Sequence, residues 1–209
     1  MNIGEMNILF LGNTDNPLIN WLRRQGEIVQ VKSDKINFKQ DENWLKDFDF
    51  AVSYGYRHMI RKNVIDIFGP NIINMHISLL PYNRGADPNL WSFLDGTPAG
   101  VTIHRVDPGL DTGDIVAQRR VKFHPYDYKN LTLSSTYNTL QNEIQKLFKE
   151  IWPQLKANEI IMTSQDNDKA TFHLAKNKED IVKNVILPNG GWDITITKLL
   201  SEYKKYKNK

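Results

Sequence analysis

The sequence predicts an α/β fold built on a parallel, helix-covered sheet, and three observations lead to this interpretation. Short apolar runs alternate with helical stretches through the N-terminal half, which is the rhythm of strand–helix–strand units. The alternation ends after residue 118, and a long amphipathic stretch follows over residues 131–155. We therefore expect one main domain over residues 1–155 and a small C-terminal unit of helices and strands over residues 156–209.

The first half of the chain supplies the elements of the sheet in order. Gly26 ends the first predicted helix, and Gly69 with Pro70 ends the second, because glycine and proline commonly follow a last helical turn. The expected strands cover residues 7–11, 28–31, 48–53 and 72–73, and the expected helices cover residues 18–22 and 61–68. In such sheets, ligands bind at the carboxyl ends of the strands.

The second half predicts one further strand over residues 116–123 and then the long helix. Apolar side chains recur in this helix at three- and four-residue intervals, which is typical of a face packed on a core. Pro188, Gly190 and Gly191 mark a turn in the C-terminal unit. We expect the final KKYKNK to be a solvated basic tail, with binding of an anionic partner as the weaker alternative.

Composition narrows the class of protein. Of the 209 residues, 40% are hydrophobic and 24% charged, as in ordinary globular proteins. The 27 basic and 24 acidic residues give a net charge of +3, which does not predict nucleic-acid binding. The absence of cysteine excludes disulfides and thiolate nucleophiles, and it fits a reducing compartment. No apolar run reaches the roughly 18 residues of a membrane span, and MNIGEMNILFLGN does not resemble a signal peptide. We expect a cytoplasmic protein with no membrane partner.

Three polar residues with complementary chemistry stand out. Asn74 and His76 are two positions apart in NMHISLLPYNRGADPNLW, where an apolar run ends, and such residues share a face of an extended segment. Asp111 lies in a glycine-rich loop in GVTIHRVDPGLDTGDIVAQ. An amide can donate to an oxyanion, an imidazole can carry a proton, and a carboxylate can orient that imidazole. These groups are the ones that acyl transfer to an amine requires.

Each of these residues also has a structural interpretation. A histidine beside a strand can be a hydrogen-bonded core residue, Asp111 can form a turn, and Asn74 can cap a strand end. His104 lies in mid-strand and is interpreted as structural, and Ser78 is not part of a nucleophile elbow. The turn at Gly12 has one glycine, so it matches neither the dinucleotide fingerprint nor a P-loop, although a substrate phosphate could lie near it. We expect no nicotinamide cofactor and no metal ion.

The strings NMHISLLP, GVTIH and GLDTGDIVAQ strongly resemble the folate-dependent formyltransferases. That group includes glycinamide ribonucleotide transformylase, the methionyl-tRNA formyltransferases and the nucleotide-sugar N-formyltransferases. The resemblance is close over roughly residues 50–120 and looser at the N-terminal end. It implies a Rossmann-like, mostly parallel open sheet and 10-formyltetrahydrofolate as formyl donor. The family's catalytic asparagine, histidine and aspartate fall on Asn74, His76 and Asp111.

The resemblance also implies where the pterin ring of the folate binds. The family forms this pocket largely from backbone groups of the loop after a middle strand and of the loop before the catalytic aspartate. Tyr56 and Met59 would give an apolar slot, and an ordinary strand-to-helix turn is the alternative interpretation. The implied positions are Tyr56, Arg57, His58, Met59 and Ile60 in the first loop, and Val106, Asp107 and Leu110 in the second.

The acceptor is inferred from RGADPNLWSFLDGTP, TFHLAKNKEDI and LPNGGWD, which look most like the nucleotide-sugar enzymes. We expect a nucleotide-linked amino-deoxy sugar, such as dTDP- or GDP-4-amino-4,6-dideoxyhexose or a 3-amino isomer, whose product feeds surface glycan synthesis such as that of lipopolysaccharide O-antigen. Glycinamide ribonucleotide and methionyl-tRNA are alternatives, although the tRNA enzymes resemble longer proteins with a C-terminal β-barrel. A non-catalytic relative that binds folate or a nucleotide sugar is a third interpretation.

The loop after His76 carries the candidate acceptor-binding residues. Arg84 suits a pyrophosphate through forked hydrogen bonds, and a salt bridge that shapes the loop is its alternative. Asp87 could accept hydrogen bonds from sugar hydroxyls or from the amine. Trp91 and Asn13 are weaker candidates. We expect a homodimer and no nucleic-acid partner.

Overall fold

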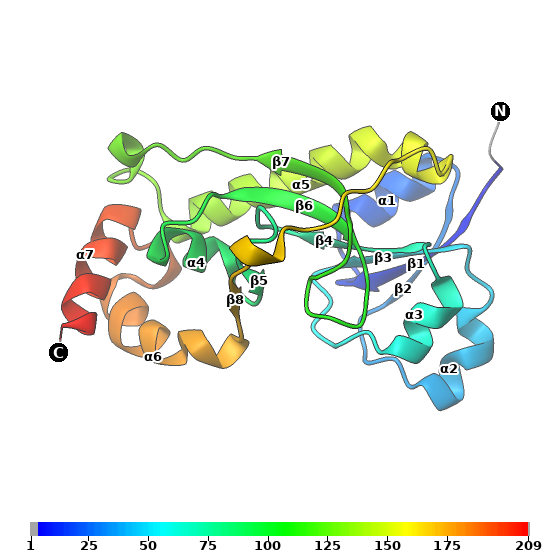
Figure 1. Ribbon diagram of the computed structural model, residues 1–209, viewed down its shortest axis with the longest axis horizontal. Helices are drawn as coiled ribbons and strands as arrows, with labels where there is room; N and C mark the ends of the chain where they lie inside the picture. Colours follow the sequence, from blue (N-terminus) through cyan, green and yellow to red (C-terminus); the bar gives the residue numbers. More distant parts are fainter. Residues whose placement is uncertain (1–3, 209) are drawn as a thin grey trace. The chain divides into compact units, whose positions relative to one another are not determined.

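A six-stranded sheet organises the protein, and the computed structural model describes residues 4–208. The strand order is β2-β1-β3-β4-β6-β7, with β1–β2, β1–β3 and β3–β4 paired in parallel (Figure 1). The six strands are β1 (Asn7–Gly12), β2 (Ile28–Lys32), β3 (Phe50–Tyr54), β4 (Ile72–His76), β6 (Gly100–Arg105) and β7 (Ile115–Arg120), and a second sheet pairs β5 (Arg84–Gly85) with β8 (Phe172–His173). The predicted α/β class with a mostly parallel open sheet is confirmed.

Three of the helices, over residues 17–24, 62–68 and 133–156, lie where the sequence predicts them. The helices are α1 (Pro17–Arg24), α2 (Phe38–Leu45), α3 (Lys62–Phe68), α4 (Pro88–Leu94), α5 (Leu133–Lys156), α6 (Glu179–Ile181) and α7 (Ile196–Lys207), with several short 3-10 turns and one π turn. α2 is not predicted from the sequence, because the polar run KQDEN interrupts its apolar spacing. α4 lies in the stretch expected to be a loop after His76, and α6 and α7 belong to the C-terminal unit, for which no helix bounds are predicted. The strand expected over residues 48–53 begins only at Phe50, and the one expected over residues 116–123 ends at Arg120.

Contacts divide the chain into two compact units. Unit 1 comprises residues 1–76, 103–117 and 148–165, and unit 2 comprises residues 77–102, 118–147 and 166–209. This division by contacts does not test the boundary expected at residue 155, which stays a prediction. Residues 1–3, which begin the stretch inspected for a signal peptide, and Lys209 of the expected tail lie outside the described residues.

In unit 1 the helices cover both faces of the strands. α2 and α3 lie on one face of β1 and β3, and α1 lies on the other (Figure 1). On the α1 face, the Trp21 ring meets Phe148 of α5 with ring centroids 6.0 Å apart, and Phe50 meets Trp152 at 5.7 Å. The α2/α3 face is closed by a buried cluster of Leu9, Leu11, Leu45, Phe48, Ala51, Val64, Ile65, Phe68 and Ile72.

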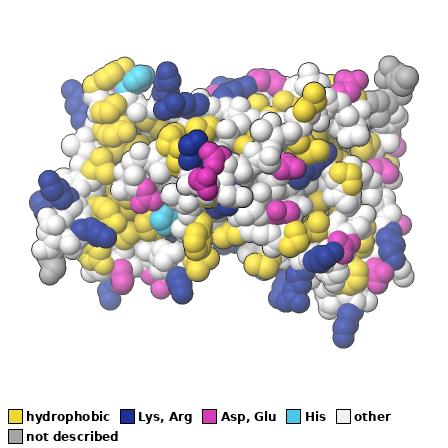
Figure 2. Space-filling view, viewed as in Figure 1, with side chains coloured by type: hydrophobic (Ala, Val, Ile, Leu, Met, Phe, Trp, Pro, Cys, Tyr) yellow, Lys and Arg dark blue, Asp and Glu magenta, His cyan; other side chains and the backbone are white. Residues whose placement is uncertain are grey.

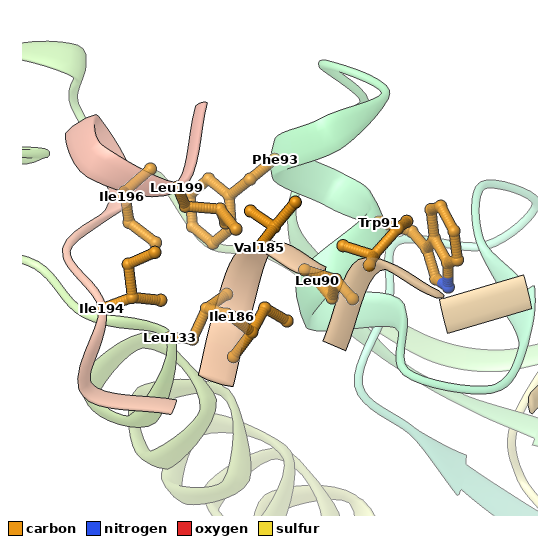
Figure 3. Close-up of a cluster of buried hydrophobic side chains, with 10 residues drawn as sticks. Leu90, Trp91, Phe93, Leu133, Val185, Ile186, Ile194, Ile196 and Leu199 are labelled. Carbon is orange, nitrogen blue, oxygen red and sulfur yellow. The ribbon is translucent and has the colours of Figure 1, made fainter. Parts of the chain in front are cut away.

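Unit 2 has its own core, where residues from α4, α5, α6 and α7 pack together (Figure 3). The Trp91 indole lies at one end of this cluster, away from Ile194 and Ile196. α7 continues to Lys207, and the partly buried Tyr203 and Tyr206 pack against the same cluster. Residues 204–207 of the expected basic tail are therefore helical, with Tyr206 packed against the cluster and the three lysines exposed.

Charge is dispersed over the surface that Figure 2 draws, where basic side chains alternate with acidic ones instead of gathering into one patch. This distribution agrees with the small net charge of +3. Among residues 4–208, no helix is both long enough and apolar enough to cross a membrane.

One charged side chain is buried within unit 1. Glu27 is only 4% exposed, and its carboxylate accepts hydrogen bonds from Lys156 Nζ at 2.6 Å, from Trp152 Nε1 at 3.2 Å and from the backbone N–H of Met6 at 2.9 Å. A buried carboxylate is tolerated only when it is paired and hydrogen-bonded. The Glu27 network therefore ties the end of α5 to the start of β1 and to the turn before β2.

We predict that Lys156→Met lowers the free energy of unfolding by about 3 kcal/mol, because it leaves the Glu27 carboxylate buried without its cation. Lys146→Met on the same helix is the matched control, since Lys146 pairs with Glu143 at 2.8 Å but its side chain is 62% exposed. The control should cost at most about 1 kcal/mol. Urea denaturation of both variants measures the difference, and equal losses would contradict the role given to the Glu27 pair.

Candidate functional site

β4 places two of the predicted site residues. Asn74 and His76 both belong to this strand, which ends at His76, and alternation along a strand gives them the same face. His76 is 8% exposed and Asn74 is partly buried. Isoleucines precede Asn74 and anchor the strand between the layers, with Ile72 and Ile73 fully buried. Two polar side chains thus emerge together from the end of an apolar strand.

Asp111 lies within reach of both residues. Its Oδ2 is 3.7 Å from His76 Nδ1, which is longer than a hydrogen bond. Its Oδ1 accepts a hydrogen bond from Asn74 Nδ2 at 3.2 Å. The structure therefore brings Asn74, His76 and Asp111 together within unit 1. The catalytic roles assigned to them stay a prediction.

His104 is a fourth member of this polar cluster. Its Nδ1 lies 2.7 Å from the carbonyl oxygen of Arg105, and because a carbonyl only accepts, Nδ1 carries the proton. Its Nε2 lies 3.2 Å from Asn74 Nδ2 and 3.4 Å from Asp111 Oδ1. The reverse orientation of the Asn74 amide would set its oxygen against the Asp111 carboxylate, so Asn74 Nδ2 is the atom that faces the cluster.

The sequence analysis did not include His104 in the site. A signal existed, because Thr102 and His104 alternate along β6 as Asn74 and His76 do along β4. Spacing alone does not say which strands become neighbours, and the sheet order that sets β4 beside β6 is a long-range property.

The loop between β6 and β7 carries Asp111 and is shaped by its own residues. Arg105 N donates to the carbonyl of Asp114 at 2.9 Å and closes the loop. Within it, Asp107 Oδ1 accepts from the N–H of Gly109 at 3.1 Å and from the hydroxyl of Thr112 at 2.6 Å. The carboxylate of Asp107 thus builds the turn. Because this carboxylate is occupied within the loop, its predicted role in folate binding falls to its backbone.

The first predicted folate loop follows β3. Tyr56 turns its ring toward the α2/α3-face cluster, and its hydroxyl donates to the carbonyl of Asp34 at 2.9 Å and accepts from the N–H of Ile36 at 3.1 Å. Burial raises the pKa of this hydroxyl above its usual value. Arg57, His58 and Met59 are exposed, Met59 by 77%.

The second predicted folate loop meets the same cluster. Val106 packs against it together with Tyr56 and Ile60, and Leu110 is 41% exposed. The two loops are therefore anchored on shared apolar side chains while their remaining side chains are open. This arrangement suits a pocket read by main-chain groups.

The predicted acceptor residues of unit 2 have partners inside that unit. Arg84 Nη2 donates to Asn167 Oδ1 at 2.7 Å, and Asp87 Oδ1 pairs with Lys178 Nζ at 2.6 Å. Trp91 is 5% exposed and stacks on His173 with ring centroids 3.8 Å apart. Asn13 of unit 1 is exposed after β1, and its carbonyl accepts from Asn16 N at 3.3 Å. These contacts fix the positions of the side chains of unit 2. A role of the four residues in binding an acceptor stays a prediction.

Over residues 4–208, no group of three or more histidine and acidic side chains is arranged to hold a metal ion.

We predict that Gly113→Ala destabilises the protein, because an added Cβ would overlap the carbonyl oxygen of Arg105. Overpacking against backbone costs about 3 kcal/mol, which for a chain of this size lowers the melting temperature by roughly 6–12 °C. Gly4→Ala is the control, since nothing lies within 4 Å of its added Cβ. Calorimetry compares the two, and an unchanged melting temperature for Gly113→Ala would refute the close approach of the Asp111 loop to β6.

Comparison with solved structures shows a similarity along nearly the whole chain. The formyltransferase PseJ from Anoxybacillus kamchatkensis, solved in complex with UDP-4,6-dideoxy-4-formamido-L-AltNAc and tetrahydrofolate, is 39% identical. The match covers 94% of this chain and 98% of that one, with a TM-score of 0.84. A 4-N formyltransferase from Francisella tularensis is 22% identical over 85% of this chain and 79% of its own, with a TM-score of 0.71, and supports the fold alone.

Curated relatives match over a shorter stretch. The methionyl-tRNA formyltransferase of Solibacter usitatus is 39% identical over 130 residues, which are 62% of this chain and 40% of the relative. The chain matches only 40–46% of the length of four curated methionyl-tRNA formyltransferases. The family described as formyl transferase matches residues 30–154, more than half of the chain. The chain therefore belongs to the formyl transferase family.

Proposed function

We propose that this protein is an N-formyltransferase that moves a formyl group from 10-formyltetrahydrofolate to the amine of a nucleotide-linked amino-deoxy sugar. The observation that carries the proposal is the match to PseJ over 94% of this chain and 98% of that one, in a complex that holds tetrahydrofolate and a UDP-linked formamido sugar. The cluster of Asn74, His76 and Asp111 supplies the chemistry that such a transfer needs.

Formyl transfer requires a bond from the acceptor nitrogen to the formyl carbon, cleavage of the bond from that carbon to the donor nitrogen, and net transfer of one proton between the two nitrogens. Asn74 Nδ2 is a donor for the carbonyl oxygen as its charge grows. His76 can steady that charge when protonated, or carry the proton when neutral. Asp111 Oδ2, 3.7 Å from His76 Nδ1, is placed to orient the ring.

The folate co-substrate supplies the formyl group, and unit 1 offers two loops to hold its pterin ring. Residues 56–60 and 106–110 both leave the α2/α3-face cluster, where Tyr56, Ile60 and Val106 anchor them. Anchored side chains and open main chain fit a flat heterocycle whose edge is recognised through backbone groups.

Methionyl-tRNA is the second candidate acceptor, because the Solibacter usitatus relative is 39% identical over its matched 130 residues. The PseJ match has the same identity but extends over nearly the whole of both chains, and it therefore favours a sugar acceptor. Arg84, Asp87, Trp91 and Asn13 stay our candidates for binding it. A cytoplasmic homodimer that acts in surface glycan synthesis, such as that of O-antigen, completes the proposal.

We predict that the protein formylates an amino sugar from a panel of UDP-, dTDP- and GDP-linked 4-amino and 3-amino sugars. The absorbance of released tetrahydrofolate measures the rate. At least one amino sugar should be formylated, and its N-acetylated analogue should be inert because it has no free amine. Turnover confined to methionyl-tRNA or to glycinamide ribonucleotide would replace the sugar proposal. Tight binding of 5-formyltetrahydrofolate with no turnover of any acceptor would support a non-catalytic relative.

We predict that Asn74→Ala, His76→Ala and Asp111→Ala each lower kcat by at least ~100-fold, because each removes a donor, a proton carrier or its orienting charge. The affinity for 5-formyltetrahydrofolate, measured by fluorescence titration, should change by less than about 3-fold, as expected for groups that act on the reacting atoms. His124→Ala, at an exposed position outside the cluster, is the control and should keep wild-type kcat. Near-normal kcat in Asp111→Ala would exclude the role given to that carboxylate.

A further inference from the structure

Gln165 lies on the segment that follows α5, and its side chain reaches the loop that carries Asp111. Its Nε2 donates to the backbone carbonyl of Asp111 at 2.9 Å and to that of Gly113 at 2.7 Å. Both acceptors are carbonyl oxygens, so the side-chain atom facing them must be the nitrogen. We propose that Gln165 is a positioning residue that holds the Asp111 carboxylate against His76 and Asn74 during formyl transfer. This inference rests on the proposed function.

The loop needs support from outside because Asp111 has a left-handed backbone, with φ of 52°. A residue with a side chain adopts this conformation at a cost, and it persists where the surroundings hold it. The φ angle of Asp111 also sets the direction of its Cα–Cβ bond relative to the preceding backbone. The hydrogen bonds from Gln165 hold the peptide planes that follow Asp111 and Gly113, and so oppose rotation of the carboxylate out of the cluster.

Gln165 is itself held in place. Two residues earlier, Thr163 exchanges both backbone hydrogen bonds with Ile115 at the start of β7, at 2.8 and 3.0 Å. One residue before that, Met162 Sδ accepts from Arg105 Nε at 3.3 Å, and Arg105 ends β6. The segment is therefore fastened to both strands that flank the Asp111 loop. A fixed backbone lets the Gln165 amide act as a rigid clamp instead of following the loop.

The clamp differs from the turn that Asp107 builds. Asp107 bonds to Gly109 and Thr112, so it shapes the loop from within. Gln165 joins the loop to a different part of unit 1 and bonds to the carbonyl of Asp111 itself. Loss of Asp107 contacts would loosen the turn, whereas loss of Gln165 contacts would let an intact turn shift as a body relative to His76.

A purely structural glutamine is the competing explanation, and unit 2 contains a suitable match. Gln118 Nε2 also donates two hydrogen bonds, to the carbonyl of Leu80 at 2.7 Å and to Thr102 Oγ1 at 2.9 Å. Neither partner belongs to the Asp111 loop. Methionine has nearly the same shape as glutamine but no N–H, so Gln165→Met and Gln118→Met remove equivalent donors at the two places.

The test compares the kinetics of Gln165→Met, Gln165→Glu and Gln118→Met. Displacement of a reacting group by about 1 Å can cost as much as 100-fold in rate, so we expect Gln165→Met to lower kcat by about 30-fold while the KM values for donor and acceptor change by less than about 3-fold. Gln165→Glu keeps the shape but only accepts hydrogen bonds, so it should be at least as impaired. Gln118→Met should keep kcat within about 3-fold at a similar loss of thermal stability. Equal kcat in the two methionine variants would overturn the proposal.

A second readout separates this inference from the proposed function. Amide hydrogen exchange of residues 107–114 in the full chain should rise in Gln165→Met and remain as in wild type in Gln118→Met, whichever acceptor the enzyme uses. If no amino sugar is turned over but the exchange changes as expected, the positioning role of Gln165 is supported and the proposed function is refuted. If an amino sugar is turned over but neither the exchange nor kcat changes in Gln165→Met, the proposed function is supported and the positioning role of Gln165 is refuted.

Discussion

The candidate site depends on one constraint, which is that β4 and β6 lie side by side in the sheet so that Asn74 meets His104. Each strand contributes a polar side chain that its own apolar neighbours cannot satisfy. Val106 N donates to the carbonyl of Ile72 at 3.1 Å and extends the contact between the strands beyond that meeting point. Because the two strands are neighbours, the loop that follows β6 places Asp111 beside Asn74 and His104, whose side chains face one another.

Much of this arrangement follows from local sequence. The spacing of Asn74 and His76 predicts that they share a face, and the apolar runs predict the strands that carry them. The position of α2 does not follow, because its exposed polar residues hide the apolar spacing, and the helical end of the chain depends on Tyr203 and Tyr206 finding a core elsewhere in unit 2. Neither His104 nor Gln165 could be assigned to the site from spacing, since their contacts join segments 30 and 54 residues apart in the sequence.

The polar cluster is costly unless each member is satisfied, because a buried group without a partner loses its hydration and gains nothing in return. Here His104 is held by a carbonyl on one side and by Asn74 on the other, and Asp111 lies within 3.7 Å of both histidines. These contacts join side chains that are only 3% to 13% exposed. Because the members share partners, single substitutions in this cluster are not additive.

The hydrogen bonds of Asn74 within the cluster also affect how strongly it would bind an oxygen that carries negative charge. Asn74 Nδ2 already donates to Asp111 Oδ1 and lies 3.2 Å from His104 Nε2, so a carbonyl oxygen that binds to it must compete with these partners. A neutral carbonyl gains little by such an exchange, whereas an oxygen that carries developing negative charge gains a stronger, charge-assisted bond. An interaction that becomes favourable only as charge develops lowers the barrier without tightening the ground state. His104 and Asp111 would thereby make the Asn74 donor available mainly to the oxygen of the transition state. This effect requires that the loop hold Asp111 in its present position.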